Sequence, residues 1–148
     1  MPRTPVPARR LQLAAALAVL ALAAGAGCSK TPSSPDFDAI VITSITPAVG
    51  TPLAPGSTVA FSGNVSYSLV SASSGTIALI FEDQNGIVLN PTSQASVAIK
   101  GGDSFTTLAD HLTVPATGVT QVQVIFAVLP TGANGTSTTA QVNYGVSS

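Results

Sequence analysis

Apolar and polar residues alternate along most of the chain after residue 39, and this pattern predicts β-strands. The clearest run covers residues 59–69, where apolar or small residues at every second position are separated by alanine, serine or asparagine. A period of two places one set of side chains on a buried face and the other set in water. Similar runs predict strands at residues 40–46, 76–82, 96–100, 104–114, 119–129 and 137–146, with a short returning strand at residues 87–89.

Turn-forming residues separate these runs. The sequence Asp-Gln-Asn-Gly at residues 83–86 predicts a hairpin turn, because an Asn-Gly pair accepts positive φ angles at low cost. Serine- and glycine-rich stretches at residues 71–75 and 100–103 predict further turns. Seven or eight short strands in about 110 residues are typical of an antiparallel two-sheet sandwich. We therefore expect an all-β domain over residues 39–148, with the hairpin of residues 119–146 at one edge.

The order of strand and turn residues also resembles a known family. Residues 45–59, 65–69, 114–116 and 142–146 are similar to bacterial immunoglobulin-like domains, which are found in exported and lipid-anchored proteins. The resemblance implies an immunoglobulin-like sandwich with a scaffold, display or adhesion role, and it transfers no catalytic residue. The chain departs from antibody-type domains because it has one cysteine and no tryptophan. Apolar packing alone must then stabilise the domain.

Residues 1–27 have the three parts of a secretory signal peptide. Three arginines among the first ten residues precede an apolar stretch at residues 11–24, which small residues follow. The apolar stretch is shorter than the about 20 residues that a membrane-spanning helix needs. We therefore expect this segment to be cleaved from the mature protein.

The end of this segment, Gly25, Ala26, Gly27 and Cys28, resembles a bacterial lipobox, with glycine in the first position where the family favours an aliphatic residue. The resemblance implies a diacylglyceryl group on the Cys28 thiol, cleavage between Gly27 and Cys28, and acylation of the new amino group, for example by palmitate. Two or more acyl chains anchor a protein stably. The alternative is an ordinary signal peptide cut a few residues earlier, which would leave Cys28 as a free thiol.

Residues 28–38 are expected to form the lipidated cysteine and a flexible tether rich in small polar residues and proline. Ser29 follows the cysteine, which in double-membrane bacteria resembles the signal for transfer to the outer membrane. The face of the membrane that carries the protein, periplasmic or outer, stays open.

Charge excludes nucleic acid as a partner of the expected mature chain. From Cys28 onward the chain has Lys30 and Lys100 against six carboxylates. Binding to phosphates requires a basic face, and two lysines cannot form one. Anionic headgroups would not attract this domain either, so the lipid on Cys28 must provide the membrane attachment.

Few residues are candidates for chemistry. His111 is the only histidine and follows Asp110. Adjacent residues on a strand point to opposite faces, so we expect no catalytic dyad and no enzymatic activity. Glu82, Asp83 and Asn85 provide oxygen atoms of the kind that Ca²⁺ prefers, although a plain hairpin turn also accounts for them. We expect no other metal site and no cofactor.

Two kinds of partner remain besides the membrane. A protein could add a strand to a sheet edge, because few charges protect the edges. A glycan could stack on exposed rings, but of the seven aromatic residues only Phe37 and Tyr144 are expected outside the core. We therefore expect an envelope-anchored structural, display or protein-interaction module, with a carbohydrate-binding or adhesion module as the alternative.

Overall fold

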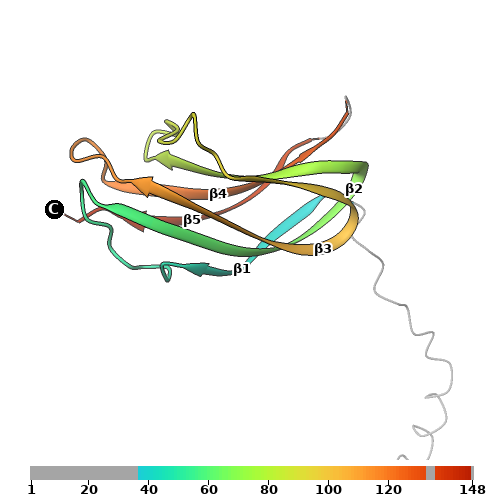
Figure 1. Cartoon of the computed structure of the whole chain (residues 1–148), viewed down its shortest axis with the longest axis horizontal. Helices are drawn as coiled ribbons and strands as arrows, with labels where there is room; N and C mark the ends of the chain where they lie inside the picture. The colour runs from blue at the N-terminus through green and yellow to red at the C-terminus, as the bar shows by residue number, and fades with distance from the viewer. Residues whose placement is uncertain (1–36, 133–135, 148) are drawn as a thin grey trace, which may run out of the picture. The chain divides into compact units, whose positions relative to one another are not determined.

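The computed structural model describes residues 37–132 and 136–147. These residues form one antiparallel sheet and contain no helix. β2 is the central strand: β3 pairs with its residues 58–69 and 74–78, β1 and β4 pair with its first and second halves, and β5 pairs with β4. The all-β class is therefore confirmed. The strands are β1 (Ala39–Thr46), β2 (Thr58–Asp83), β3 (Ser96–Thr113), β4 (Gln121–Pro130) and β5 (Thr138–Gly145) (Figure 1).

The predicted division into seven or eight strands is not confirmed, because the described residues form five. Residues 59–69 and 76–82 belong to the single strand β2, and residues 96–100 and 104–113 belong to β3. Their serine- and glycine-rich connections bend the strands without reversing them. Turns and bulges use the same small residues, so the sequence pattern alone did not separate the two outcomes.

The bend in β2 is a large β-bulge. Leu69 pairs with Gly102, whereas Ser74 pairs with Lys100, so β2 advances five residues while β3 advances two. Gly101 lies against this bulge, and a Cβ atom there would be 2.6 Å from the carbonyl oxygen of Ala72. Glycine is therefore required where the two bent strands approach each other.

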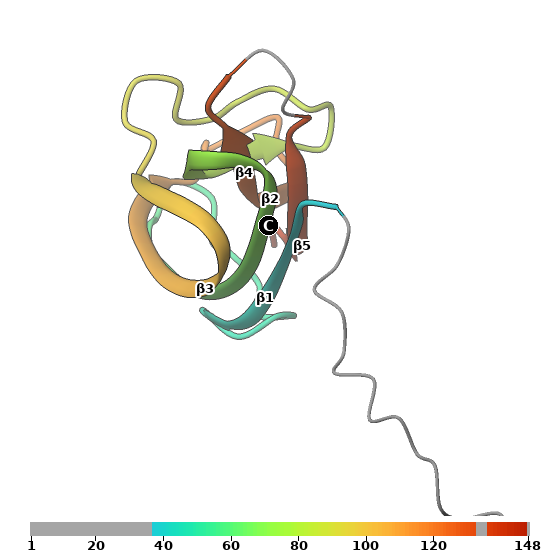
Figure 2. The same ribbon diagram turned by 90° about the vertical axis from the view of Figure 1, so that its right-hand side faces the viewer.

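The bent strands curl the sheet around its inner face into an open half-barrel (Figure 2). β1 comes close to β5, but no backbone ladder joins these two strands in the described part of the chain. Aromatic rings fill the inside: the Phe61 centroid lies 5.0 Å from that of Phe81 and 5.4 Å from that of Tyr144, the latter edge to face. Gly63 leaves room for the ring of Phe126, which a Cβ atom at position 63 would approach to 2.2 Å.

The hairpin turn after β2 is confirmed. The Gly86 amide donates to the carbonyl of Asp83 (3.1 Å), and Gly86 has a φ of 76°. The expected returning strand at residues 87–89 is reduced to a single bridge between Glu82 and Val88. The returning chain therefore lies beside the end of β2 without extending the sheet.

Candidate functional site

The expected lipidation and cleavage residues, Cys28 and Gly27, lie outside the described residues, as do the signal peptide at 1–27 and the tether except for Phe37 and Asp38. The lipid anchor therefore stays a prediction. None of the described residues forms a helix long and apolar enough to cross a bilayer.

The calcium candidates form a turn in which the Asp83 carboxylate has other partners. Its Oδ1 accepts hydrogen bonds from the amides of Asn85 (2.8 Å) and Ile87 (2.9 Å), and its Oδ2 accepts one from Asn85 Nδ2 (3.3 Å). The Ile87 amide, followed by the Asn85 groups, holds the Asp83 pKa below its usual value against the opposing effect of burial. Glu82 precedes Asp83 on the strand. Among residues 37–132 and 136–147, no group of three or more histidine, cysteine or acidic side chains could hold a metal ion.

Asp110 and His111 separate as expected for neighbours on a strand. His111 is exposed, whereas Asp110 is partly buried. The Asp110 Oδ2 atom accepts hydrogen bonds from Asn90 Nδ2 (3.2 Å) and from the amide of Ala95 (3.3 Å). Asn90 in turn accepts the amide of Phe81 at 3.3 Å. Asp110 and Asn90 thus fix the chain between β2 and β3, a role that the sequence pattern did not reveal.

The outer edge of β5 presents backbone groups that have no partner in the described structure. The Gly145 carbonyl accepts the Leu53 amide (2.9 Å) on this edge, while the Val146 amide turns the other way and donates to Thr120 (2.9 Å). Because alternate residues of a strand face the same edge, Thr139, Gln141 and Asn143 direct their amides and carbonyls outward with Gly145. The free edge therefore runs from Thr139 to Asn143 and ends where Leu53 occupies it.

The outer face of β1, β2 and β3 carries rows of small polar side chains. Asn64 lies in one such row, where its Nδ2 donates to Ser44 Oγ (2.7 Å) and its Oδ1 accepts the Thr107 hydroxyl. In another row the Thr58 and Thr113 hydroxyls are 3.0 Å apart. Many of the polar groups on this face therefore satisfy one another.

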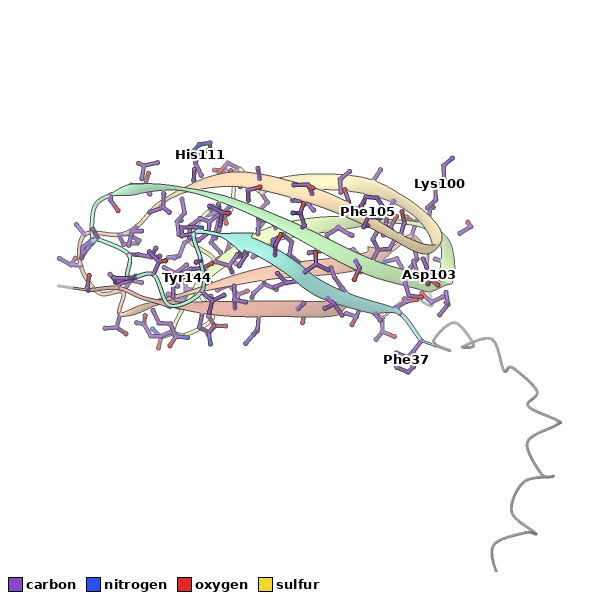
Figure 3. All side chains as sticks on the ribbon, turned by 90° about the horizontal axis from the view of Figure 1, so that it is seen from below. Phe37, Lys100, Asp103, Phe105, His111 and Tyr144 are labelled. Atoms are coloured by element: carbon purple, nitrogen blue, oxygen red, sulfur yellow. The ribbon has the colours of Figure 1, made fainter. Side chains whose placement is uncertain are left out.

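Apolar side chains interrupt this polar face at one end of the domain. Val41 and Phe105 flank Ser66 in one row and are 58% and 84% exposed. Phe37 is 70% exposed and Val70 is 44% exposed. We call these four residues the end patch, and Figure 3 shows two of them, Phe37 and Phe105, at the same end of the domain as Lys100 and Asp103.

The expected exposure of aromatic rings was right for Phe37 and wrong for two others. Tyr144 is fully buried, and its hydroxyl donates to the carbonyl of Pro47 at 2.6 Å. Phe105, expected in the core, points to water. The sequence did contain a signal, because Phe105 occupies an odd position on β3, whereas the buried Leu108 and Leu112 occupy even ones.

Asp38 binds the bulge of β2 beside the end patch, a role that the pattern of apolar and polar residues did not predict. Its Oδ1 accepts the amides of Val70 (2.8 Å) and Ser71 (2.9 Å), and its Oδ2 accepts the Ser71 hydroxyl (2.5 Å). These amides belong to the bulge of β2, where the ladder with β3 is interrupted. Partial burial acts to raise the Asp38 pKa, but the hydrogen bonds from Ser71 and Val70 outweigh it and keep the pKa below its usual value of 3.8.

No protein-family model matches the chain, and no curated protein matches it in sequence. Among solved structures, the domain is similar to part of a family 123 glycoside hydrolase from Clostridium perfringens, studied for glycolipid glycan hydrolysis, with a TM-score of 0.36 and 11% identity. The match covers 67% of this chain and 23% of that enzyme. The chain therefore spans less than a quarter of the length of the protein it resembles.

Proposed function

We propose that this chain is a lipoprotein of the bacterial envelope, held at the outer membrane by lipid on Cys28, and that its β domain binds a protein partner without catalysing a reaction. The observation that supports partner binding is the outer edge of β5, which no backbone ladder covers in the described part of the chain, although β1 comes close to β5. An extended segment of another protein would pair with the outward backbone groups of Thr139, Gln141 and Asn143.

Among residues 37–132 and 136–147, β1, β3 and β5 each have one edge that forms no ladder with another strand, and β5 differs from the other two. β1 carries a bulge at Thr43, between Ile42 and Ser44. β3 bends sharply at its glycine pair and carries charged residues along its length. β5 has the sequence TTAQVNYG, with no charge and no proline, and its register with β4 is continuous. Bulges, charges and prolines are the usual protection of edge strands, so β5 is the edge best suited to accept another strand.

An immunoglobulin-like sandwich is part of the same proposal. Dividing β2 and β3 at the bulge gives seven strand segments in two walls. β1, the first half of β2 and the second half of β3 would form one wall. The other halves, with β4 and β5, would form the second. Sandwiches of this class commonly serve as recognition modules.

Photocrosslinking in intact cells tests partner binding. A photoreactive residue at position 141 should give reproducible links to one envelope protein, identified by mass spectrometry together with the N-terminal peptide of this chain. A Gln141→Pro substitution should abolish the partner's copurification, because proline removes an outward amide that the β4–β5 ladder does not use.

Gln141→Ala is the matched control, since it removes the same side chain and keeps the amide. Copurification should survive in this variant. Links spread over many proteins, or equal copurification by the proline and alanine variants, would contradict edge pairing. An unmodified Cys28 in the N-terminal peptide would contradict the lipid anchor separately.

Glycan binding is a second candidate because Phe105 is exposed beside polar side chains. The arrangement supports it less well than edge pairing. Asn64 and Thr107, on the row next to Phe105, already bond to each other, which leaves fewer groups for sugar hydroxyls. Binding of envelope polysaccharides that Phe105→Ala abolishes would favour this candidate.

A further inference from the structure

The end patch is the main concentration of exposed apolar surface on the described part of the chain. Seven large hydrophobic residues are exposed among residues 37–132 and 136–147. Four of these seven make up the patch: Phe37, Val41, Val70 and Phe105. The Asp38 hydrogen bonds to Val70 and Ser71 bring the start of the domain against the bulge of β2. Val41 and Phe105 share one row across the sheet, and Figure 3 places Phe37 at the same end. Exposed apolar residues gathered in one region mark an interaction site more reliably than scattered ones do.

We propose that the end patch rests on the phospholipid surface to which the chain is anchored, with the rings of Phe37 and Phe105 in the headgroup region. This inference rests on the lipid on Cys28 in the proposed function. Phe37 is the ninth residue after Cys28, and nine residues span at most about 32 Å. The patch therefore begins where the tether ends, which makes the bilayer the apolar surface always within reach.

The charges near the patch favour apolar docking over electrostatic docking. Lys100, at the same end of the domain, is the only lysine or arginine among residues 37–132 and 136–147. Its long side chain can cover apolar surface and direct its amine to a lipid phosphate. The Asp38 carboxylate accepts hydrogen bonds from Val70 and Ser71 in the bulge, so this negative charge is directed at the protein. One lysine cannot attract an anionic bilayer strongly, so binding should depend on the rings and not on salt.

The absence of tryptophan from the sequence provides a direct test. The full chain with the Phe105→Trp substitution is produced in a bacterium that processes lipoproteins, purified, and reconstituted in phosphatidylcholine vesicles. The acyl chains of these lipids carry bromine, which quenches indole fluorescence on contact. Phe37→Trp is a second probe of the patch. Ile87→Trp is the control, because Ile87 is 62% exposed on the hairpin turn after β2. All three proteins carry the same residues 28–36.

We expect the indole at position 105 to be quenched at least threefold more strongly than the indole at position 87, with no change between low and high salt. Equal quenching at the two positions, or none at either in protein that floats with the vesicles, would overturn docking and leave the patch to a protein or glycan. Protein that does not float with the vesicles would contradict the lipid anchor on Cys28, and the docking proposal, which depends on that anchor, would then also be rejected.

Discussion

At one end of the domain, which we call the tyrosine end, a buried ring and its hydroxyl join distant parts of the chain. Tyr144 packs against Phe61 and donates to the Pro47 carbonyl. At the other end, the tether end, the Asp38 carboxylate binds the bulge of β2, and the apolar residues beside it face water. The first end is held by apolar packing, whereas the second is held by hydrogen bonds to a charged group.

The two ends should therefore respond to different conditions. Apolar packing does not depend on pH, so the contacts of Phe61 with Phe81 and Tyr144 should persist until Tyr144 ionises. At this end the turn held by the Asp83 carboxylate should respond to acid. Hydrogen bonds to a carboxylate weaken when that group is protonated, so the tether end should loosen in acid. The variants below test this difference between the two ends.

The largest effect is expected from Phe61→Ala at the tyrosine end. Phe61 is 1% exposed and contacts both Phe81 and Tyr144. Removing its ring should lower the free energy of unfolding by about 3–5 kcal/mol, as measured by urea denaturation. Phe105→Ala removes the same ring from an exposed site at the tether end and should change stability by less than about 0.5 kcal/mol. Similar losses in the two variants would remove the distinction between the ends.

Asp38→Ala should have the next largest effect, because it leaves two amides of the bulge without their acceptor. We expect a loss of about 1–2 kcal/mol in the free energy of unfolding at pH 7. Asp38→Asn is the control that keeps an acceptor oxygen, and it should lose less.

The pH dependence of these variants has a defined sign. The folded Asp38 pKa lies below its usual value of 3.8, so its contribution is present above about pH 4 and is lost as the pH falls through the folded pKa. The difference in stability between the parent protein and Asp38→Ala should therefore shrink on acidification. A difference that stays constant down to pH 2 would show that the carboxylate charge does not hold the bulge.

These residues also show what the sequence pattern could predict. Alternation located most of the strand positions, and the Asn-Gly pair located the hairpin turn, because both depend on local chain geometry. The alternation did not distinguish a bulge from a turn at residues 70–73, because the outcome depends on whether β3 follows the bend of β2. Asp38 and Tyr144 could not be assigned because their partners lie 32 to 97 residues away in sequence. The free edge of β5 was foreseen only in general terms, since the identity of an edge strand depends on the whole topology.

Tyr144→Phe should have a smaller effect than Asp38→Ala, because the ring stays and only the bond to Pro47 is lost. We expect a loss of about 0.5–1.5 kcal/mol in urea denaturation. Burial raises the Tyr144 pKa above 10.0, so the parent protein should lose stability as the pH rises past 10. The phenylalanine variant lacks this group and should show a weaker alkaline loss. An identical alkaline loss in both proteins would assign it to another group.

The smallest effect is expected from Ser68→Ala, beside the end patch. Ser68 is 5% exposed, and its hydroxyl has no hydrogen-bond partner in the described structure. A buried hydroxyl without a partner is unfavourable compared with a methyl group of similar size. The alanine variant should therefore equal the parent protein or exceed its free energy of unfolding by up to about 1 kcal/mol. A clear loss of stability would mean that the Ser68 hydroxyl has a hydrogen-bond partner in solution, such as a bound water. The interior of the tether end would then contain a polar group that contributes to stability.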